Sequence, residues 1–449
     1  MLLVYVIPVW YVTYRVFRQS GRQTDTLKTA GIRIGIYTVN HDENKEEMPV
    51  GYYNEGKWWA SPFNDEDKVR SQFSFASKVT IHDATLRDGE QTPGVVFDKD
   101  TKVHIAELLD ELGVERIEAG MPAVSESDFQ AVREISRRGL KAEPFVFVRA
   151  MRRDIDMALD AGAKGIIIEI PIGYPKLKYQ FNWTWENVAE KSIDCINYAK
   201  QQGLYAVYFP YDTTRARNED LEQLIGVLMK EAVPDSIGIV DTMGCAMPET
   251  IQYLVRKVKR LTDGLPVEVH THNDFGMAVA TELAGITAGA DCVHSCINGL
   301  GERTGNAALE QLMVSMKILL DLPNDYRIEK LPRVCEEVAK ITGIPLPANM
   351  PVSGVRNYTR ESGIGVDLVL KKPLVMFATN PALYGRTGHI ALGKKSGKAS
   401  VEYYVDKLGL KATADEVAEI LAKVKEKGAA EKRLLSEEEF KEIYDKVVC

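Results

Sequence analysis

Three short segments of the chain carry side chains that could bind a metal ion together. His270 and His272 lie two residues apart in an apolar, β-branched run, Asp88 follows an earlier run of the same kind, and Asn306 follows a glycine-rich loop. Side chains at i and i+2 of a strand face the same side, so both imidazoles can reach one ion. Nitrogen ligands together with carboxylate and amide oxygens suit a substrate-binding divalent ion such as Mn, Mg, Co or Zn.

The elements that must position these side chains follow a regular order. From residue 78 to residue 320, apolar β-branched runs alternate eight times with amphipathic stretches, the last helix being predicted at 306–320. Eight such units in about 250 residues predict a (β/α)8 TIM barrel, an α/β fold. A doubly wound open sheet is the alternative, but the first strand-helix turn lacks the GxGxxG pattern. In a barrel, the chemistry lies where the strands end, which is where these polar side chains stand.

The composition favours a small-molecule enzyme. The 449 residues are 45% hydrophobic and 27% charged, with a net charge of -8, so the chain has no general basic field to attract nucleic acid. The six cysteines contain no CxxC pair and are too sparse for a disulfide scaffold. We therefore expect reduced thiols, a cytoplasmic location and no nucleic-acid partner.

The chain divides into three parts by pattern. Residues 1–77 read as an N-terminal extension, of which 1–47 have mixed composition and need not belong to the structural protein. The apolar start, residues 1–12, is well short of the roughly 20 residues that span a membrane, so no membrane association is expected. Residues 78–325 form the predicted catalytic barrel, and residues 326–449 a linker and a mostly helical C-terminal subdomain.

Three long motifs resemble one enzyme family. TLRDGEQTPG at 85–94, HTHNDFG at 270–276 and NGLGERTGNAALE at 298–310 are similar to the isopropylmalate, homocitrate, citramalate and Re-face citrate synthases. The resemblance covers about residues 79–320 and continues more weakly into LGKKSGK at 392–398, where Lys395 replaces the family's histidine. It implies a metal-dependent Claisen condensation of acetyl-CoA with a 2-oxo acid, which releases CoA.

The resemblance also implies roles for individual residues. The implied metal ligands are Asp88, His270, His272 and Asn306, and Arg87 is expected beside the keto oxygen, where it would stabilise a developing alkoxide. The other pocket positions that match are Glu118, expected to be catalytic, and the substrate-binding Gln91 and Thr242. An equally good interpretation of Glu118 is a buried carboxylate whose hydrogen bonds are satisfied, and an equally good interpretation of Thr242 is an ordinary strand hydroxyl.

The sequence departs from the family pattern at the general base. The family's histidine in a C-terminal ESGIHxDG segment is replaced here by Gly365, within ESGIGVD. The residue that deprotonates acetyl-CoA is therefore unassigned. Four residues near Gly365 in the chain are candidates: Tyr358, Glu361, Tyr384 and His389.

A second departure bears on the acceptor. Tyr211 stands in FPYD where the family has an acidic residue, and Arg149 ends the third predicted strand. A retained cation and a lost anion favour a dicarboxylic 2-oxo acid. We therefore expect oxaloacetate as acceptor and citrate as product, with isopropylmalate, homocitrate or citramalate synthase as the alternative.

Two other classes of protein remain open at this stage. A carbon-carbon lyase of the 3-hydroxy-3-methylglutaryl-CoA type shares the RDG and HxH motifs, but its catalytic cysteine is missing from the loop NGLGERTGN. A catalytically silent barrel that acts as a scaffold is conceivable because the family's basic histidine is absent. In the resembling family the C-terminal subdomain reaches over a partner's active site, so a homodimer is implied.

Overall fold

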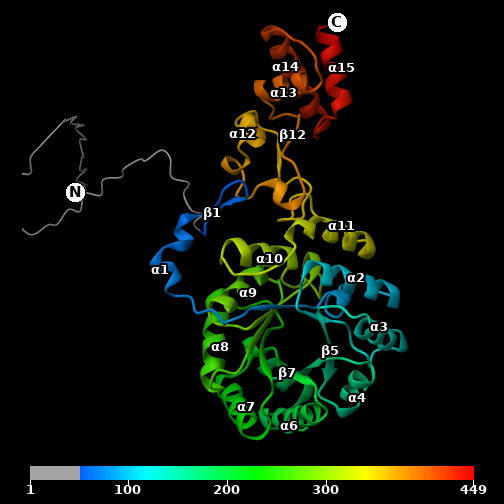
Figure 1. Cartoon of the computed structure of the whole chain (residues 1–449), viewed down its shortest axis with the longest axis vertical. Coiled ribbons are helices and arrows are strands. Elements are labelled where there is room, and N and C mark those ends of the chain that lie inside the picture. The colour runs from blue at the N-terminus through cyan, green and yellow to red at the C-terminus, as the bar shows by residue number, and fades with distance from the viewer. Residues whose placement is uncertain (1–50, 449) are drawn as a thin grey trace, which may run out of the picture. The chain divides into compact units, whose positions relative to one another are not determined.

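The computed structural model describes residues 51–448, and its central element is a closed barrel of eight parallel strands (Figure 1). The strand order around the barrel is β10-β3-β4-β5-β6-β7-β8-β9, which is sequential, with the last strand closing on the first. The predicted (β/α)8 fold is confirmed. The strands are β3 Thr80–Asp83, β4 Arg116–Glu118, β5 Glu143–Arg149, β6 Gly165–Pro171, β7 Tyr205–Tyr211, β8 Ser236–Asp241, β9 Val267–Thr271 and β10 Cys292–Ser295.

Amphipathic helices surround the barrel and bury their apolar faces against it (Figure 1). Polar residues define where several of them begin: the side chains of Asp98 and Ser125 accept hydrogen bonds from backbone N–H groups in the first turns of the next helices. The helices are α2 Lys99–Leu112, α3 Glu126–Arg137, α4 Arg152–Asp160, α6 Trp185–Gln201, α7 Asn218–Glu231, α8 Pro248–Leu261, α9 Ala278–Thr287 and α10 Leu309–Ile318, with the short α5 Tyr174–Lys176 before α6.

The last of these helices begins later than its sequence pattern predicts. The helical pattern starts at Asn306, but α10 starts at Leu309. Asn306 instead forms a β-bridge with His272, and Ala308 forms one with Cys296. The extended backbone at 306–308 therefore holds Asn306 at the mouth of the barrel, beside β9, rather than on a helix.

The interior of the barrel has two chemically different halves. The apolar half consists of five buried side chains on β5 to β8: Phe145, Ile167, Val207, Phe209 and Val240. The polar half consists of four buried or largely buried side chains on β3, β4, β9 and β10: His82, Arg116, Glu268 and His294.

Ionic and ring contacts connect the polar half. The rings of His82 and His294 stack with centroids 4.4 Å apart. Nε2 of His294 lies 3.0 Å from Glu268, which also accepts a hydrogen bond of 2.9 Å from Arg116. Buried charges are thus compensated by one another rather than by water.

A second hydrophobic core lies in the C-terminal region, between residues 366 and 444. It is built by α12 Val366–Lys371, α13 Lys398–Lys407, α14 Ala414–Glu431 and α15 Glu437–Val448, with a two-stranded sheet of β11 Thr359–Arg360 and β12 His389–Ile390. The preceding helix, α11 Leu331–Thr342, contributes its apolar residues to the core of the barrel. The three-part division of the chain stays a prediction.

Residues before the barrel are tied to the C-terminal region. The strands β1 Tyr53–Asn54 and β2 Trp58–Trp59 form a hairpin, followed by the short helix α1 Asp67–Arg70. The backbone N–H of Trp59 donates to the carbonyl of Ala378 at 2.8 Å. The predicted non-structural segment 1–47 and the apolar start lie outside the described residues. No helix between residues 51 and 448 is long and apolar enough to cross a membrane.

Candidate active site

A cavity of about 540 Å³ opens at the carboxyl ends of the barrel strands. Pockets of this size commonly hold small-molecule substrates. Eight of the residues singled out from the sequence line it: Arg87, Asp88, Gln91, Arg149, Tyr211, Thr242, His270 and His272.

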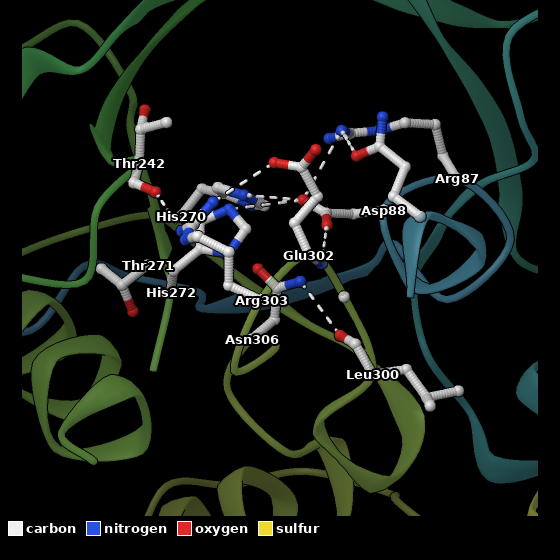
Figure 2. A network of polar contacts seen from close by, with 12 residues as sticks. Arg87, Asp88, Thr242, His270, Thr271, His272, Leu300, Glu302, Arg303 and Asn306 are labelled. Atoms are coloured by element: carbon white, nitrogen blue, oxygen red, sulfur yellow. Dashed lines mark hydrogen bonds and ion pairs between the residues drawn. The ribbon is translucent and has the colours of Figure 1, made fainter. Parts of the chain in front are cut away.

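Asp88 and the two histidines converge at the wall of this cavity (Figure 2). Oδ2 of Asp88 lies 3.3 Å from Nε2 of His270 and 3.6 Å from Nε2 of His272, and all three side chains are buried. Two other buried groups among the described residues have metal-ligand chemistry, but they share His294 and none of their residues lines the cavity. Among the described residues, only the group of Asp88, His270 and His272 borders the cavity, so this group is the one that could hold an ion in contact with substrate.

Asn306 supplies a fourth polar atom at the same place. Its Nδ2 donates to the carbonyl of Leu300 at 3.0 Å, whereas its buried Oδ1 has no hydrogen-bond partner (Figure 2). Nδ1 of His270 and of His272 are also buried without a partner. Unpaired buried polar atoms are rare, and a cation among these donors would satisfy the free oxygen.

The charges around Asp88 favour its ionised form. Burial alone would raise the pKa of Asp88, but Arg87 and the two histidines outweigh it and hold that pKa well below its usual range. Burial lowers the pKa of His272 to about 4 and also lowers the pKa of His270. Near neutral pH the group therefore presents a carboxylate and two neutral imidazoles, the protonation states that metal binding requires.

Arg87 is held by Glu118. Nε of Arg87 donates to Glu118 at 2.6 Å, Nη2 of Arg87 lies 3.4 Å from the other carboxylate oxygen, and the guanidinium stacks over Phe147. Glu118 is fully buried on β4 and is not among the residues that line the cavity. Burial raises the pKa of Glu118 and the guanidinium of Arg87 opposes that rise. Glu118 therefore reaches the cavity only through Arg87.

The predicted substrate-binding residues differ in how firmly they are held. Arg149 is half-exposed, and Nε and Nη2 donate to the buried carboxylate of Asp154 at 2.7 and 2.9 Å. Oγ1 of Thr242 accepts a hydrogen bond of 2.8 Å from the backbone of Asp212. Tyr211 and Gln91 line the cavity, and Oε1 of Gln91 lies 3.5 Å from Nη1 of Arg87.

The four C-terminal candidates for a base lie elsewhere. Tyr358, Glu361, Tyr384 and His389 belong to the C-terminal region, and none lines the cavity. Gly365, where the family pattern has histidine, adopts a φ of +77° at the start of α12, and a Cβ there would press on the sulfur of Met376. A left-handed backbone disfavours any side chain at this position, so the departure from the pattern is built into the local fold.

Four charged residues of the cavity wall were not found by sequence reasoning: Glu169, Lys176, Lys191 and Glu302. Glu302 belongs to NGLGERTGN, in which only Asn306 was assigned a role, and its backbone N–H lies 3.4 Å from Oδ1 of Asp88. Glu169 stands in GIIIEIP, and a single acid near the end of an apolar strand is the signal that could have found it.

An eight-stranded parallel barrel with a carboxylate-histidine group at its mouth defines the class of α/β-barrels built to hold a divalent ion at their substrate cavity. Within this class the chain belongs to the HMGL-like family, whose pattern matches residues 78–338. Residues 352–432 match the homocitrate synthase post-HMGL domain-like family.

Named relatives share most of their length with this chain. The homocitrate synthase AksA of Methanocaldococcus jannaschii is 39% identical over 89% of this chain and 97% of its own. The 2-isopropylmalate synthase of Sulfolobus acidocaldarius is 37% identical over 80% of this chain and 94% of its own. A relative from Archaeoglobus fulgidus with a citramalate synthase name is 42% identical over 80% of this chain and 73% of its own.

A solved structure agrees with the fold. The HMG-CoA lyase of Bacillus subtilis superimposes with a TM-score of 0.53 at 20% identity, over 61% of this chain and 96% of that one. The relatives with high identity are named as synthases, so the protein is an enzyme of the condensing, acyltransferase type. The favoured prediction of a Re-face citrate synthase is not supported, and the alternative, an isopropylmalate, homocitrate or citramalate synthase, fits better.

Proposed function

We propose that the enzyme condenses acetyl-CoA with a 2-oxo acid and releases CoA, with Asp88, His270, His272 and Asn306 as the ligands of a divalent ion. The observation that carries this proposal is the convergence of a low-pKa carboxylate, two neutral imidazoles and an unpaired amide oxygen at the substrate cavity. Such an ion polarises the ketone of a 2-oxo acid. Manganese, magnesium, cobalt and zinc all fit this mixed donor set.

Arg87 is the proposed second contact of the reacting ketone. Its guanidinium borders the cavity beside Asp88, and Glu118 and Phe147 fix its position from behind. A donor positioned before the reaction stabilises the alkoxide that forms when the ketone is attacked. Burial disfavours the charged guanidinium, but Glu118 and Asp88 outweigh it and raise the pKa of Arg87 further, so the donor keeps its charge at every working pH.

For the acceptor we favour 2-oxoglutarate, which makes the product homocitrate. Three basic side chains besides Arg87 line the cavity: Arg149, Lys176 and Lys191. An isolated apolar tail would gain little beside these cations, whereas a distal carboxylate would be attracted. The relative with 97% of its length covered is named a homocitrate synthase, in agreement with this choice.

A panel of acceptors tests the proposal. The purified enzyme with Mn²⁺ and acetyl-CoA is offered glyoxylate, pyruvate, 2-oxoisovalerate, oxaloacetate or 2-oxoglutarate, and free thiol is measured. We expect the largest kcat/KM with 2-oxoglutarate. A preference for 2-oxoisovalerate or pyruvate would assign isopropylmalate or citramalate synthase activity, and no thiol release with any acceptor would refute the condensation itself.

Arg149→Ala should lower kcat/KM with 2-oxoglutarate about ten- to a hundredfold, because it removes a charge-assisted contact worth about 1.5–3 kcal/mol. With pyruvate, which lacks the distal carboxylate, the loss should be small. Arg152→Ala is the matched control, since Arg152 pairs with Asp194 in the same manner but does not line the cavity. Equal losses with both acceptors would show that Arg149 does not read the distal group.

Gly301→Ala should weaken metal binding about ten- to a hundredfold, the usual effect of displacing a group that orients a ligand. Gly301 has a φ of +144°, and a Cβ there would overlap Nδ2 of Asn306 and lie 3.0 Å from Oδ1 of Asp88. Gly94→Ala is the control, because Gly94 also has a positive φ but its Cβ would meet open space. Titration with Mn²⁺, followed by calorimetry, measures the difference, and equal affinities in both variants would contradict the assignment of Asn306.

We also propose a homodimer in which the partner's C-terminal region closes over the cavity. This agrees with the finding that none of the cavity-lining residues belongs to the chain's own C-terminal region. Light scattering of the purified protein tests the oligomeric state, and a monomer at micromolar concentration would exclude this arrangement.

A further inference from the structure

One carboxylate without a partner lies on the wall of the cavity opposite Asp88, His270 and His272. Glu169 lies near the end of β6, three strands from β3 and three strands from β9 in the eight-stranded barrel. Asp88 follows β3 and His270 lies on β9, so Glu169 faces them across the cavity. A substrate held beside Asp88 and His270 therefore lies between them and Glu169.

The surroundings of Glu169 leave its carboxylate free for a ligand. Its neighbours in register are Arg149 on β5, which is paired with Asp154, and Phe209 on β7. Two residues earlier on the same strand, Ile167 belongs to the apolar half of the interior. Among the described residues the carboxylate of Glu169 makes no hydrogen bond and no ion pair, whereas its backbone belongs to the β5-β6-β7 ladder. The carboxylate thus lies at the cavity wall above apolar side chains, with its lone pairs directed to no protein group.

We infer that Glu169 is the general base that removes the methyl proton of acetyl-CoA. This inference rests on the proposed condensation. The carboxylate takes the proton, and the electron pair of the C–H bond moves into the thioester carbonyl to form the enolate. The enolate carbon then bonds to the ketone carbon of the acceptor, and the ketone oxygen becomes an alkoxide that takes up a proton from water. The carboxyl group of Glu169 releases its proton to water and returns to the ionised form. Water finally hydrolyses the thioester and releases CoA.

Burial supports this role, because it raises the pKa of Glu169 to about 7 against the opposing effect of Arg87. A base with a pKa near the working pH combines a useful fraction of the ionised form with sufficient basicity. The other charged and titratable groups of the surrounding strands and loops are Asp88, Glu118, Arg149, Tyr211 and Glu302. The assignment also provides the base that is missing where Gly365 replaces the family's histidine.

Hydrogen exchange at the methyl group separates proton removal from every later step. The enzyme with Mn²⁺, acetyl-CoA and a 2-hydroxy acid, which occupies the acceptor site without reacting, is incubated in D₂O, and deuterium in the methyl group is measured by mass spectrometry. Wild type should exchange. Glu169→Gln, which keeps the shape of the side chain, should lose exchange and turnover about a hundred- to ten-thousandfold, with unchanged affinity for the 2-hydroxy acid. Glu143→Gln is the control: Glu143 is exposed at the start of β5, and this variant should behave as wild type.

The possible outcomes distinguish this inference from the proposed function. If wild type condenses and Glu169→Gln still exchanges at the wild-type rate, the base lies elsewhere. If Glu169→Gln loses affinity for the 2-hydroxy acid together with exchange, Glu169 positions the acceptor and the inference is wrong. If wild type neither exchanges nor condenses with any acceptor, the proposed function fails, and the role of Glu169 fails with it.

Discussion

Asp88→Ala and His270→Ala should each lower kcat by at least about a thousandfold and release the bound divalent ion. Each variant removes a proposed metal ligand from a group in which two imidazoles lie 3.3 and 3.6 Å from one carboxylate. Without the ion the ketone loses its Lewis acid, and oxyanion stabilisation of this kind is worth about 2.7–4 kcal/mol per donor or more. Steady-state kinetics and elemental analysis of the purified variants measure both effects.

A histidine away from the cavity provides the control for these variants. His104 is exposed on α2 and pairs with Glu337, so His104→Ala should retain both metal and turnover. EDTA treatment of wild type should reproduce the loss, and added Mn²⁺ should reverse it. Full activity in metal-free wild type would disprove the metal assignment.

Glu118→Ala should lower the free energy of unfolding by about 3–5 kcal/mol. It breaks a largely buried ion pair and leaves the guanidinium of Arg87 with Asp88, at 3.5 Å, as its remaining charged partner, which is more costly than lacking the pair altogether. Chemical denaturation followed by circular dichroism measures the loss.

The double variant Arg87→Met, Glu118→Gln separates charge from packing. It removes both charges at similar volume, so it should regain much of the lost stability while remaining inactive. If the double variant is as unstable as Glu118→Ala, the loss arises from packing on β4 rather than from the unpaired charge.

The order of strands and helices was predictable because each unit carries its own apolar period, and eight periods in succession close a barrel. The start of α10 was not, since the helical pattern continues into Asn306 while a bridge to His272 holds the backbone extended. That bridge joins segments that only the closed barrel brings together. Local pattern carries no information on such contacts.

The candidate site was predictable where its residues stand in local motifs at strand ends, as Asp88, His270 and His272 do. Two other features were missed, because the roles of the residues depend on side-chain direction in three dimensions. Glu118 lies behind Arg87 instead of in the cavity, and Glu169 reaches the cavity from a strand whose composition indicates a buried core. The preference for oxaloacetate is not supported by the named relatives. It depended on Arg149 and Tyr211 alone, and the sequence did not show that Lys176 and Lys191 share the cavity or that Arg149 pairs with Asp154.

The division of the barrel interior into an apolar and a polar half sets different tolerance to substitution on its two sides. Around Ile167 and Val207, exchanges between aliphatic residues of similar volume should be nearly neutral, so these positions are free to drift. Substitution of either His294 or Glu268 alone leaves the charge or ring nitrogen of the other without a partner, so tolerated changes must occur in pairs. When the cavity is redesigned, single substitutions on β5 to β8 should therefore be tolerated, whereas substitutions on β9, β10, β3 and β4 must be combined in pairs.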